Sequence, residues 1–254
     1  MPKANCAAVP PRHSGCCPGT AEAGRKGIGA LSSQQIVPAP WRLSGNALIL
    51  VSWPDPRDPD LHRFTPPSLR ERAVSSPSLI MFVDYRSSDA GPYRELLFIP
   101  GQFRVRAGRR WSITRIYVST AVSVRSGRAN WGIPKNLADF QVEGEPGQAQ
   151  RVTVSAEGRQ VACLEFESVG PRFPVSGSLL PTPLRSLIQV SGDRYFEFAP
   201  NARGRIRAAR LLHSETDPDL FPKAGDGRRL GAFCIPEFRM EFPRARISSP
   251  EERA

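Results

Sequence analysis

The residues best suited to chemistry in this chain surround one lysine, Lys135. The chain contains four lysines, and arginine supplies the other 31 of its 35 basic residues. Arginine stays protonated in proteins, whereas lysine can lose its proton when burial disfavours the ammonium form. Apolar residues flank Lys135 at Trp131, Ile133, Leu137 and Phe140. A neutral lysine amine can attack a carbonyl and form a Schiff base. The alternative is a loop lysine whose stem only packs on Trp131.

One carboxylate, Glu95, is placed where it could serve such a lysine. Residues 93–99 have the composition of a strand, and Pro100 ends it. Because side chains alternate along a strand, Glu95 shares a face with Tyr93 and Leu97. This pattern predicts a carboxylate inside a barrel, and the alternative is a surface acid on an edge strand.

Two segments resemble the acetoacetate decarboxylase family. Residues 127–138 read Gly-Arg-x-x-Trp-Gly-Ile-Pro-Lys-x-Leu-Ala, which resembles the lysine segment of that family. Residues 91–96 resemble its tyrosine–x–glutamate strand. The resemblance implies that Lys135 forms a Schiff base with a keto acid, as in acetoacetate decarboxylase itself, and that Glu95 faces it. It also implies a closed, cone-like β-barrel and assembly into homo-oligomers.

The resemblance runs from about Trp41 to about Phe242 and contains three departures. The family's second lysine, next to the Schiff-base lysine, is Asn136 here. Its substrate-carboxylate arginine lies in an Arg-Gly-Pro-Tyr segment, whose nearest match is Pro-Ala-Pro-Trp at 38–41. A further family carboxylate would align near Ile80, and Asp84 is the closest acid. We therefore expect acetoacetate to be a poor substrate and a bulkier or less acidic carbonyl compound to be a better one.

These observations define a candidate site for a small-molecule carbonyl substrate, with no cofactor or metal expected. The expected catalytic residues are Lys135 and Glu95. Arg128 has two interpretations, since it could act as a cation that lowers the lysine pKa or cap backbone carbonyls. The histidines and cysteines lack ligand spacing, so a zinc site is not expected. The residues expected to bind substrate are Tyr93, Tyr117, Arg128, Trp131, Ile133 and Asn136.

Short strands separated by turns dominate the sequence pattern. The 254 residues include 26 prolines and 21 glycines, which interrupt helices. Many short strands with few helices are typical of an antiparallel barrel or sandwich. Together with the resemblance, this predicts a mainly β fold, a closed antiparallel β-barrel with a few short helices. The expected strands are 46–53, 79–85, 93–99, 112–120, 140–142, 151–155, 161–169, 195–198, 204–212 and 230–242, with a short helix from about Ala121.

The remaining segments are expected to be loops or tails. Residues 54–67 should form a loop or a short helical excursion, and residues 171–183 should be irregular. Pro134 excludes a regular helix through Lys135, which predicts that the lysine lies on a rigid loop. The expected domain limits are a disordered tail at 1–35, the barrel at 36–247 and a C-terminal tail at 248–254.

The net charge of +11 raises the question of an anionic partner. The arginine clusters at 104–110 and 203–210 lack a recognition-helix pattern and interleaved aromatic residues, so no nucleic-acid partner is expected. No run of 18 apolar residues occurs, so no membrane-spanning helix is expected. Residues 1–35 lack the apolar core of a signal peptide, and the five cysteines favour a reducing compartment. These features predict a cytoplasmic location.

Three functions remain open at this point. The leading hypothesis is a lyase of decarboxylase or aldolase type that forms a Schiff base through Lys135. The second is a non-catalytic barrel that binds a small ligand and has lost the carboxylate site. The third is a lipocalin-like carrier, against which the lysine segment argues.

Overall fold

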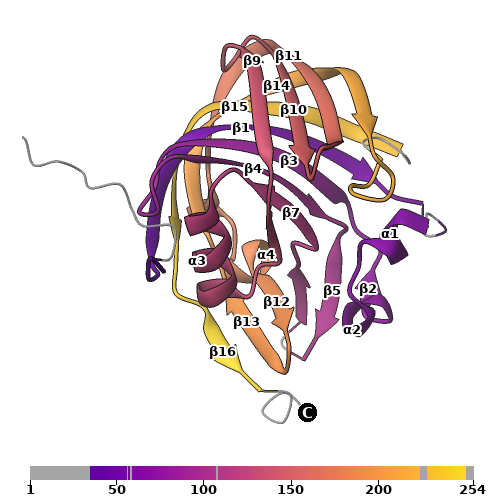
Figure 1. The fold of residues 1–254 in the computed structure, drawn as a ribbon, viewed down its shortest axis with the longest axis vertical. Coiled ribbons are helices and arrows are strands. Elements are labelled where there is room, and N and C mark those ends of the chain that lie inside the picture. The colour runs from indigo at the N-terminus through magenta and orange to yellow at the C-terminus, as the bar shows by residue number, and fades with distance from the viewer. Residues whose placement is uncertain (1–34, 56, 58, 107, 224–227, 250–254) are drawn as a thin grey trace, which may run out of the picture. The chain divides into compact units, whose positions relative to one another are not determined.

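Ten strands form one strongly curved, nearly closed sheet in the computed structural model, which describes residues 35–55, 57, 59–106, 108–223 and 228–249 (Figure 1). These residues all belong to one unit, Leu31–Ala254. The strand order is β8-β7-β4-β3-β1-β15-β14-β11-β10-β9. The strands are β1 Trp41–Trp53, β3 Ser78–Ser87, β4 Tyr93–Ile99, β7 Arg115–Val118, β8 Lys135–Leu137, β9 Asp139–Gly144, β10 Ala149–Ala156, β11 Arg159–Ser176, β14 Asn201–Thr216 and β15 Arg228–Phe242.

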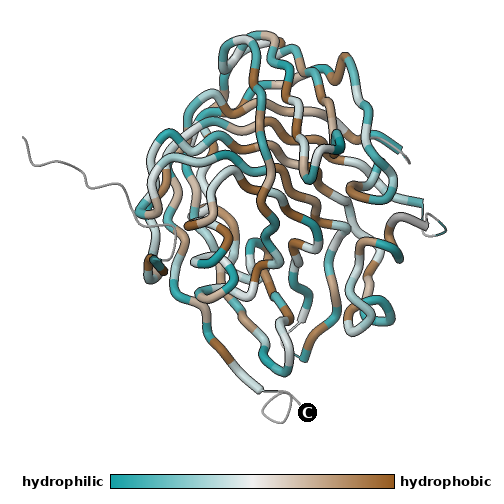
Figure 2. The backbone as a smooth tube through the Cα atoms, viewed as in Figure 1, coloured by the Kyte–Doolittle hydropathy of each residue, from teal (hydrophilic) through white to brown (hydrophobic). Residues whose placement is uncertain are grey.

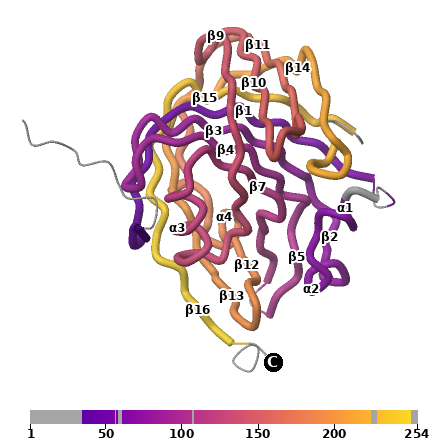
Figure 3. Tube along the Cα trace, in the orientation of Figure 1, coloured from indigo at the N-terminus to yellow at the C-terminus, as the bar shows by residue number. Residues whose placement is uncertain are grey.

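A smaller sheet and short helices complete the fold. The smaller sheet has the order β16-β13-β12-β6-β5-β2, and the trace in Figure 3 follows these strands below the large sheet. Its strands are β2 Ala73–Val74, β5 Gln102–Val105, β6 Gly108–Trp111, β12 Leu187–Ser191, β13 Arg194–Phe198 and β16 Arg246–Ser248. The helices are α1 Pro59–Arg63, α2 Pro67–Arg70, α3 Ala121–Trp131, α4 Thr182–Arg185 and the 3-10 turn η1 Gly177–Leu179.

Apolar residues pack against both faces of the strands β3, β4 and β7. On β4, Tyr93 and Leu97 belong to a first core cluster, whereas Leu96 and Phe98 belong to a second cluster on the opposite face of the strand. Figure 2 shows the resulting concentration of hydrophobic residues along the middle strands. Because both faces are buried, alternate residues of one strand line two different interiors. Glu95 lies between Tyr93 and Leu97 in this alternation, on the face of the first cluster.

The predicted fold class is confirmed, since strands dominate and the helices are few and short. The predicted strand 93–99 coincides with β4. Two ladders are nevertheless parallel, β7 with β8 and β6 with β12. The prediction that Lys135 lies on a loop was wrong, because the residue begins β8 and pairs with Ile116. Pro134 lies just before the strand, where a missing N–H costs no ladder bond.

The prediction that residues 171–183 are irregular was wrong for 171–176, which continue β11. A register shift between Val169 and Phe173 absorbs Gly170 and Pro171, and the strand then pairs again with β14. Residues 1–34 of the expected tail lie outside the described residues. Ser248, which was expected in the C-terminal tail, belongs to β16 and pairs with Tyr195 of β13. No helix among the described residues is long and apolar enough to cross a membrane.

Helix α3 is defined at both ends by its sequence. Thr120 is the N-cap, and its hydroxyl accepts a hydrogen bond from the Ser123 N–H. Gly132 ends the helix with φ of 64°, and its N–H donates to the Arg128 carbonyl. The helix lies against β7, β8 and β13 (Figure 1). The end of α3 therefore fixes where the chain enters β8, whose first residue is Lys135.

We expect Gly132→Ala to be costly for two separable reasons. A residue with a Cβ is strained at this positive φ, and the Cβ would lie 2.6 Å from a ring carbon of the buried Phe196. Gly192→Ala is the matched control, because Gly192 has φ of 57° with nothing within 4 Å of the added Cβ. The expected loss of unfolding free energy is about 1 kcal/mol for Gly192→Ala and about 2–5 kcal/mol for Gly132→Ala.

Urea denaturation of both variants measures the two losses. Equal losses would show that the Phe196 contact does not constrain the end of α3.

Candidate active site

The backbone of Lys135 is held by its neighbours on α3 and β7. Its strand β8 pairs in parallel with β7, where Lys135 lies opposite Ile116. The Arg128 guanidinium donates from Nε to the Lys135 carbonyl oxygen at 2.9 Å. Arg128 therefore caps a backbone carbonyl, the second of the two interpretations of this residue. The backbone at Lys135 is thus fixed, and the side chain projects toward the interior, where the residue is 3% exposed.

The Lys135 side chain runs along α3 toward the beginning of that helix. Its stem packs on Gly127, where an added Cβ would lie 2.7 Å from Cδ and 2.8 Å from Cε. Its amine then reaches Ser123, one helical turn earlier, with Nζ 3.0 Å from the Ser123 Oγ. Ser123 is fully buried. Any side chain larger than hydrogen at position 127 would therefore displace the lysine stem.

Glu95 and two tyrosines complete a buried polar group around the amine. Glu95 Oε2 lies 3.5 Å from the Lys135 Nζ, and its Oε1 accepts a hydrogen bond of 2.8 Å from the Tyr85 hydroxyl. The Tyr93 ring lies under the amine, with its centroid 4.9 Å from Nζ. Tyr85 and Tyr93 are opposite each other in the β3–β4 hairpin. Strand alternation therefore brings both tyrosines and Glu95 to the same face of the sheet.

Burial dominates the electrostatics of this group. Desolvation lowers the pKa of the Lys135 ammonium, and the Glu95 carboxylate opposes this shift without cancelling it. The amine also lies beside Ser123 in the first turn of α3, and the partial positive charge at the beginning of a helix acts in the same direction. Burial and then the Glu95 charge raise the pKa of Tyr85 and of Tyr93 well above the usual value. Both phenols therefore remain protonated, and the lysine is biased toward the neutral, nucleophilic amine.

The amine opens into a cavity of about 220 Å³ on the face of the large sheet that carries Glu95. Of its lining residues, three carry a charge: Lys135, Glu95 and Arg203. The remainder of the wall is almost entirely aliphatic and aromatic. No group of three or more potential metal-ligating side chains occurs in the part of the chain that the structure describes. The cavity is thus an apolar chamber with the polar group around Lys135 at its buried end.

The structure brings five of the eight residues expected from the sequence to this cavity. Lys135 and Glu95 lie in contact, and Tyr93, Trp131 and Ile133 line the wall. Arg128 and Asn136 do not line it, and they instead contact each other, with Arg128 Nη2 3.3 Å from Asn136 Oδ1. Asn136 follows Lys135 on β8, so its side chain points to the opposite face.

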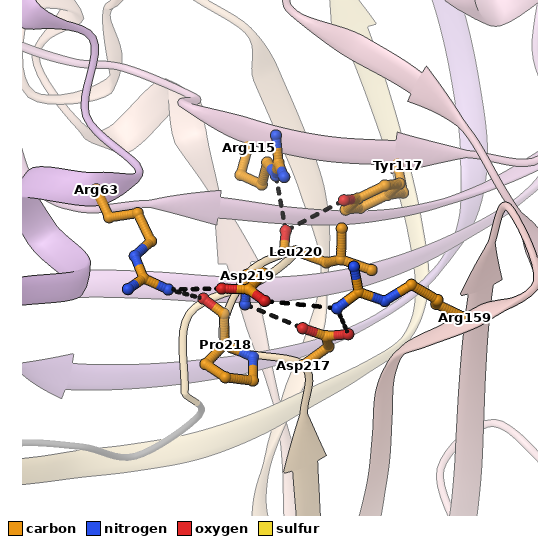
Figure 4. A network of polar contacts seen from close by, with 8 residues as sticks. All are labelled: Arg63, Arg115, Tyr117, Arg159, Asp217, Pro218, Asp219 and Leu220. Carbon is orange, nitrogen blue, oxygen red and sulfur yellow. Dashed lines mark hydrogen bonds and ion pairs between the residues drawn. The ribbon is translucent and has the colours of Figure 1, made fainter.

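Tyr117 also lies away from the cavity. On β7, Ile116 faces the cavity, so Tyr117 points to the second core cluster. Its hydroxyl donates a hydrogen bond of 3.1 Å to the Leu220 carbonyl oxygen. The same oxygen accepts a hydrogen bond of 2.7 Å from Arg115 Nε. Figure 4 shows both side chains directed at this carbonyl, beside the ion pair of Arg159 with Asp217. Tyr117 therefore anchors the turn after β14.

Three residues of the site were not identified from the sequence. Ser123 belongs to the helix expected from about Ala121, but nothing in the sequence shows that its hydroxyl reaches the lysine. Tyr85 ends a predicted strand, and the two-residue alternation with Val83 was the available signal. Arg203 belongs to a cluster that was considered only as a nucleic-acid contact; it borders the cavity, while its pairing with Arg239 places its side chain on the other face from the cavity-lining Phe238 and Met240.

The two other departures from the family pattern have structural consequences. In the segment 38–41, Trp41 enters the cavity, and no arginine of that segment exists to do so. Asp84 lies opposite Arg94 in the β3–β4 ladder and forms an ion pair with it at 3.2 Å, outside the cavity. Among the cavity-lining residues that the structure describes, Glu95 is therefore the carboxylate at the buried end and Lys135 the basic side chain.

The lysine segment, the glutamate strand and the fold around them agree with a comparison of sequences. The profile of the family described as acetoacetate decarboxylase (ADC) matches residues 34–188. The chain belongs to the acetoacetate decarboxylase family. No curated protein matches the chain.

Solved structures of low sequence identity share the fold. The acetoacetate decarboxylase of Legionella pneumophila subsp. pneumophila str. Philadelphia 1 is 13% identical with a TM-score of 0.62, over 84% of this chain and 88% of that one. An acetoacetate decarboxylase-like enzyme from Sphingomonas wittichii RW1 is 12% identical with a TM-score of 0.63, over 89% and 98%. The enduracididine biosynthesis enzyme MppR in complex with pyruvate is 16% identical with a TM-score of 0.60, over 85% and 93%.

The lowered pKa of Lys135 predicts a dependence of stability on pH. Between the folded-state pKa and the ordinary value of 10.5, the unfolded chain binds a proton that the folded chain does not. Stability contributed by this residue therefore rises with pH in that window, by at most about 1.4 kcal/mol per pH unit. The comparison is Glu95→Gln with the double variant Glu95→Gln/Lys135→Met, which differ only in the lysine.

Urea denaturation from pH 7 to 10.5 should show Glu95→Gln gaining stability relative to the double variant as the pH rises. Parallel curves over the whole range would show that the Lys135 pKa is unchanged by folding.

Proposed function

We propose that this protein is a lyase that forms a Schiff base between Lys135 and a carbonyl substrate. The observation that carries the proposal is the position of the Lys135 amine, which is buried, desolvated and open to a cavity, 3.5 Å from the Glu95 carboxylate. Membership of the acetoacetate decarboxylase family supports it. A neutral amine and an adjacent proton carrier are the two groups that imine formation requires.

The chemistry follows from these groups. The Lys135 nitrogen adds to the carbonyl carbon, and the resulting carbinolamine loses water to give a protonated imine. Cleavage of the bond between the α-carbon and a carboxylate then releases carbon dioxide, whereas cleavage of the bond to a hydroxyl-bearing carbon releases an aldehyde as the hydroxyl gives its proton to Glu95. In both cases the electron pair of the broken bond moves toward the imine nitrogen. The enamine takes a proton at the α-carbon, and water hydrolyses the new imine to release product and the free amine. Glu95 is the proton carrier within reach of the nitrogen.

Ser123 and Tyr85 have supporting roles in this proposal. The Ser123 hydroxyl lies 3.0 Å from the lysine Nζ and holds the amine toward Glu95. The Tyr85 hydroxyl donates to the other carboxylate oxygen of Glu95, which leaves Oε2 for the lysine. These contacts orient the nucleophile and the proton carrier before the substrate enters.

Both decarboxylation and aldol-type cleavage fit this mechanism. Complexes of MppR with pyruvate, and with the condensation product of pyruvate and imidazole 4-carboxaldehyde, are known for that enzyme. The second complex is a precedent, on the same fold, for carbon–carbon bond chemistry other than loss of carbon dioxide. We therefore extend the proposal to both reaction types for this chain.

A non-catalytic binding barrel is the alternative function. It is supported by the absence of the side chains that the family uses to bind a substrate carboxylate. The segment 38–41 offers no arginine, and Asp84 is paired outside the cavity. In that case Lys135 and Glu95 would contact a bound ligand without forming a covalent bond to it. Trapping of the imine by borohydride reduction, described next, separates the two functions.

Borohydride reduction in the presence of a panel of keto acids and aldehydes should label Lys135. The chain has four lysines, so peptide mapping identifies the site unambiguously. Lys135→Arg should abolish labelling, because a guanidinium does not become a nucleophile. Glu95→Gln should still be labelled but turn over at least about 100-fold more slowly, since it removes a proton carrier and not the nucleophile.

Circular dichroism of each variant checks that the fold persists. If no member of the panel labels Lys135 in the folded wild-type protein, the binding function replaces the lyase.

Gly127→Ala tests whether the position of the lysine amine matters. The new methyl group would push the Lys135 stem away from α3 and so move Nζ relative to Ser123 and Glu95. We expect the labelling rate to fall at least tenfold, because displacement of about 1 Å at a reacting group costs up to about 100-fold. Unfolding free energy should change little, since the strain opposes a helix-propensity gain of about 1 kcal/mol for alanine over glycine. An unchanged labelling rate would show that the amine is not positioned by α3.

A further inference from the structure

We propose that the substrate is an uncharged β-hydroxy ketone with an apolar substituent, and that the reaction is its cleavage to a ketone and an aldehyde. The inference rests on the proposed function, because it places the ketone at Lys135. It narrows that function from two reaction types to one and adds the class of substrate. Three features of the site carry the argument: the charges at the buried end, the protons available there, and the apolar wall.

The charges at the buried end disfavour a carboxylate on the substrate. Among the described lining residues, Lys135 is the basic side chain there and Glu95 the acidic one, 3.5 Å apart. Arg203 borders the cavity, but its side chain lies on the other face of the sheet, opposite Arg239. Once the protonated imine has formed, the Glu95 carboxylate balances its charge. A substrate carboxylate would then be a second buried anion without a second cation, which is strongly disfavoured.

The cleavage of a β-hydroxy ketone closes its proton balance with Glu95 alone. Glu95, carrying one proton when the amine attacks, gives it to the hydroxide that leaves the carbinolamine. The β-hydroxyl group then gives its proton to Glu95 as the bond between the α- and β-carbons breaks, the aldehyde forms, and the electron pair moves toward the imine nitrogen. Glu95 passes this proton to the α-carbon of the enamine and receives another from the water that hydrolyses the imine. No proton enters or leaves the site over the whole cycle.

Decarboxylation does not close its proton balance in this way. Loss of carbon dioxide from a keto acid anion leaves an enamine that needs a proton, and Glu95 has already given its proton to the departing water. Burial and the Glu95 charge raise the pKa of Tyr85 and of Tyr93, so these phenols retain their protons. Each turnover would therefore require one proton from the solvent. The single carboxylate at the buried end is sufficient for the aldol cleavage and insufficient for the decarboxylation.

The wall of the cavity favours an apolar substituent on the hydroxyl-bearing carbon. It is formed by residues such as Leu43, Val83, Leu97, Ile235 and Phe238, which offer no hydrogen-bonding side chain. The volume of about 220 Å³ exceeds the roughly 150 Å³ of an apolar cavity that accommodates benzene. A phenyl group, or an alkyl group of similar size, therefore fits, and its burial favours binding.

Two matched substrates test which bond the protein breaks. The uncharged one is 4-hydroxy-4-phenylbutan-2-one, whose cleavage releases benzaldehyde and acetone. The acidic one is 3-oxo-5-phenylpentanoate, whose decarboxylation releases carbon dioxide and 4-phenylbutan-2-one. Each kcat/KM is divided by the rate constant for a simple primary amine in solution, which removes the difference in intrinsic reactivity. We expect the resulting value to be at least about tenfold higher for the hydroxy ketone.

A smaller hydroxy ketone tests the apolar wall. The compound 4-hydroxypentan-2-one carries a methyl group in place of the phenyl group. Its normalised kcat/KM should be at least about tenfold lower, because it lacks the group that the wall would bury.

A pair of variants tests why a carboxylate is excluded. The probes are 4-phenylbutan-2-one and 2-oxo-4-phenylbutanoate, which differ in a methyl group or a carboxylate next to the ketone and contain no bond that the reaction cleaves. The measured quantity is the concentration of each that gives half-maximal borohydride labelling of Lys135, in Glu95→Gln and in Asp84→Asn. Asp84 is the matched control, because it lies on the same hairpin but pairs with Arg94 outside the cavity.

We expect Glu95→Gln to shift the ratio of the two concentrations toward the keto acid by at least about tenfold. The reason is that the imine can then pair with the substrate carboxylate in a site of low dielectric. Asp84→Asn should leave the ratio unchanged. Comparison of ratios between proteins cancels the different intrinsic reactivity of the two ketones.

The contrary outcomes are distinguishable. If the keto acid is the better substrate, or if the hydroxy ketone is not cleaved although 4-phenylbutan-2-one labels Lys135, the Schiff base stands and the inference is overturned. The inference is also overturned if Glu95→Gln and Asp84→Asn behave alike, or if the methyl compound reacts as well as the phenyl compound. If no ketone labels Lys135 in the folded protein, the proposed function fails and the inference fails with it.

Discussion

The site depends on the burial of one lysine amine against the beginning of a helix. An ammonium ion in such a position is disfavoured by desolvation, and the Glu95 carboxylate only partly compensates. Asn136 replaces the second cation that the family uses beside its nucleophile, so the lowered pKa here comes chiefly from burial. Because burial is a property of the whole cavity, every strand that closes the cavity contributes to the state of the lysine. The pKa of one residue is thereby tied to the integrity of the sheet.

Three residues without functional groups set the position of that amine. Gly132 ends α3 at a positive φ, Pro134 precedes β8, and the parallel ladder with β7 then fixes the backbone of Lys135. Gly127 provides the space along which the stem runs to Ser123. The segment 127–138 is therefore a structural unit, in which a helix end, a short strand and a glycine gap together aim one side chain. This explains in physical terms why glycine and proline surround Lys135.

Part of this site could be predicted from the sequence. The remaining residues could not, for geometric reasons. Strand alternation and the resemblance predicted that Glu95 faces Lys135. The two side chains are in contact in the structure. Alternation did not identify the inner face of β7, because both faces of that strand are buried, so Tyr117 was assigned to the cavity although Ile116 occupies it. The continuation of β11 beyond Pro171 depends on a bulge and on pairing with β14, a strand about 30 residues away. Short-range patterns do not report such long-range pairing.

The surroundings of the Lys135 amine differ in kind from the wall of the rest of the cavity. At the buried end the amine, Glu95, Ser123 and Tyr85 are in mutual contact, and the dielectric is low, so small displacements and single charges have large effects on the lysine. The remaining wall is almost entirely aliphatic and aromatic, and this chain has no arginine at 38–41. Desolvation by that wall lowers the pKa of Lys135, and Glu95 opposes the shift without cancelling it. The balance between these two effects therefore depends on how completely the strands exclude water from the amine.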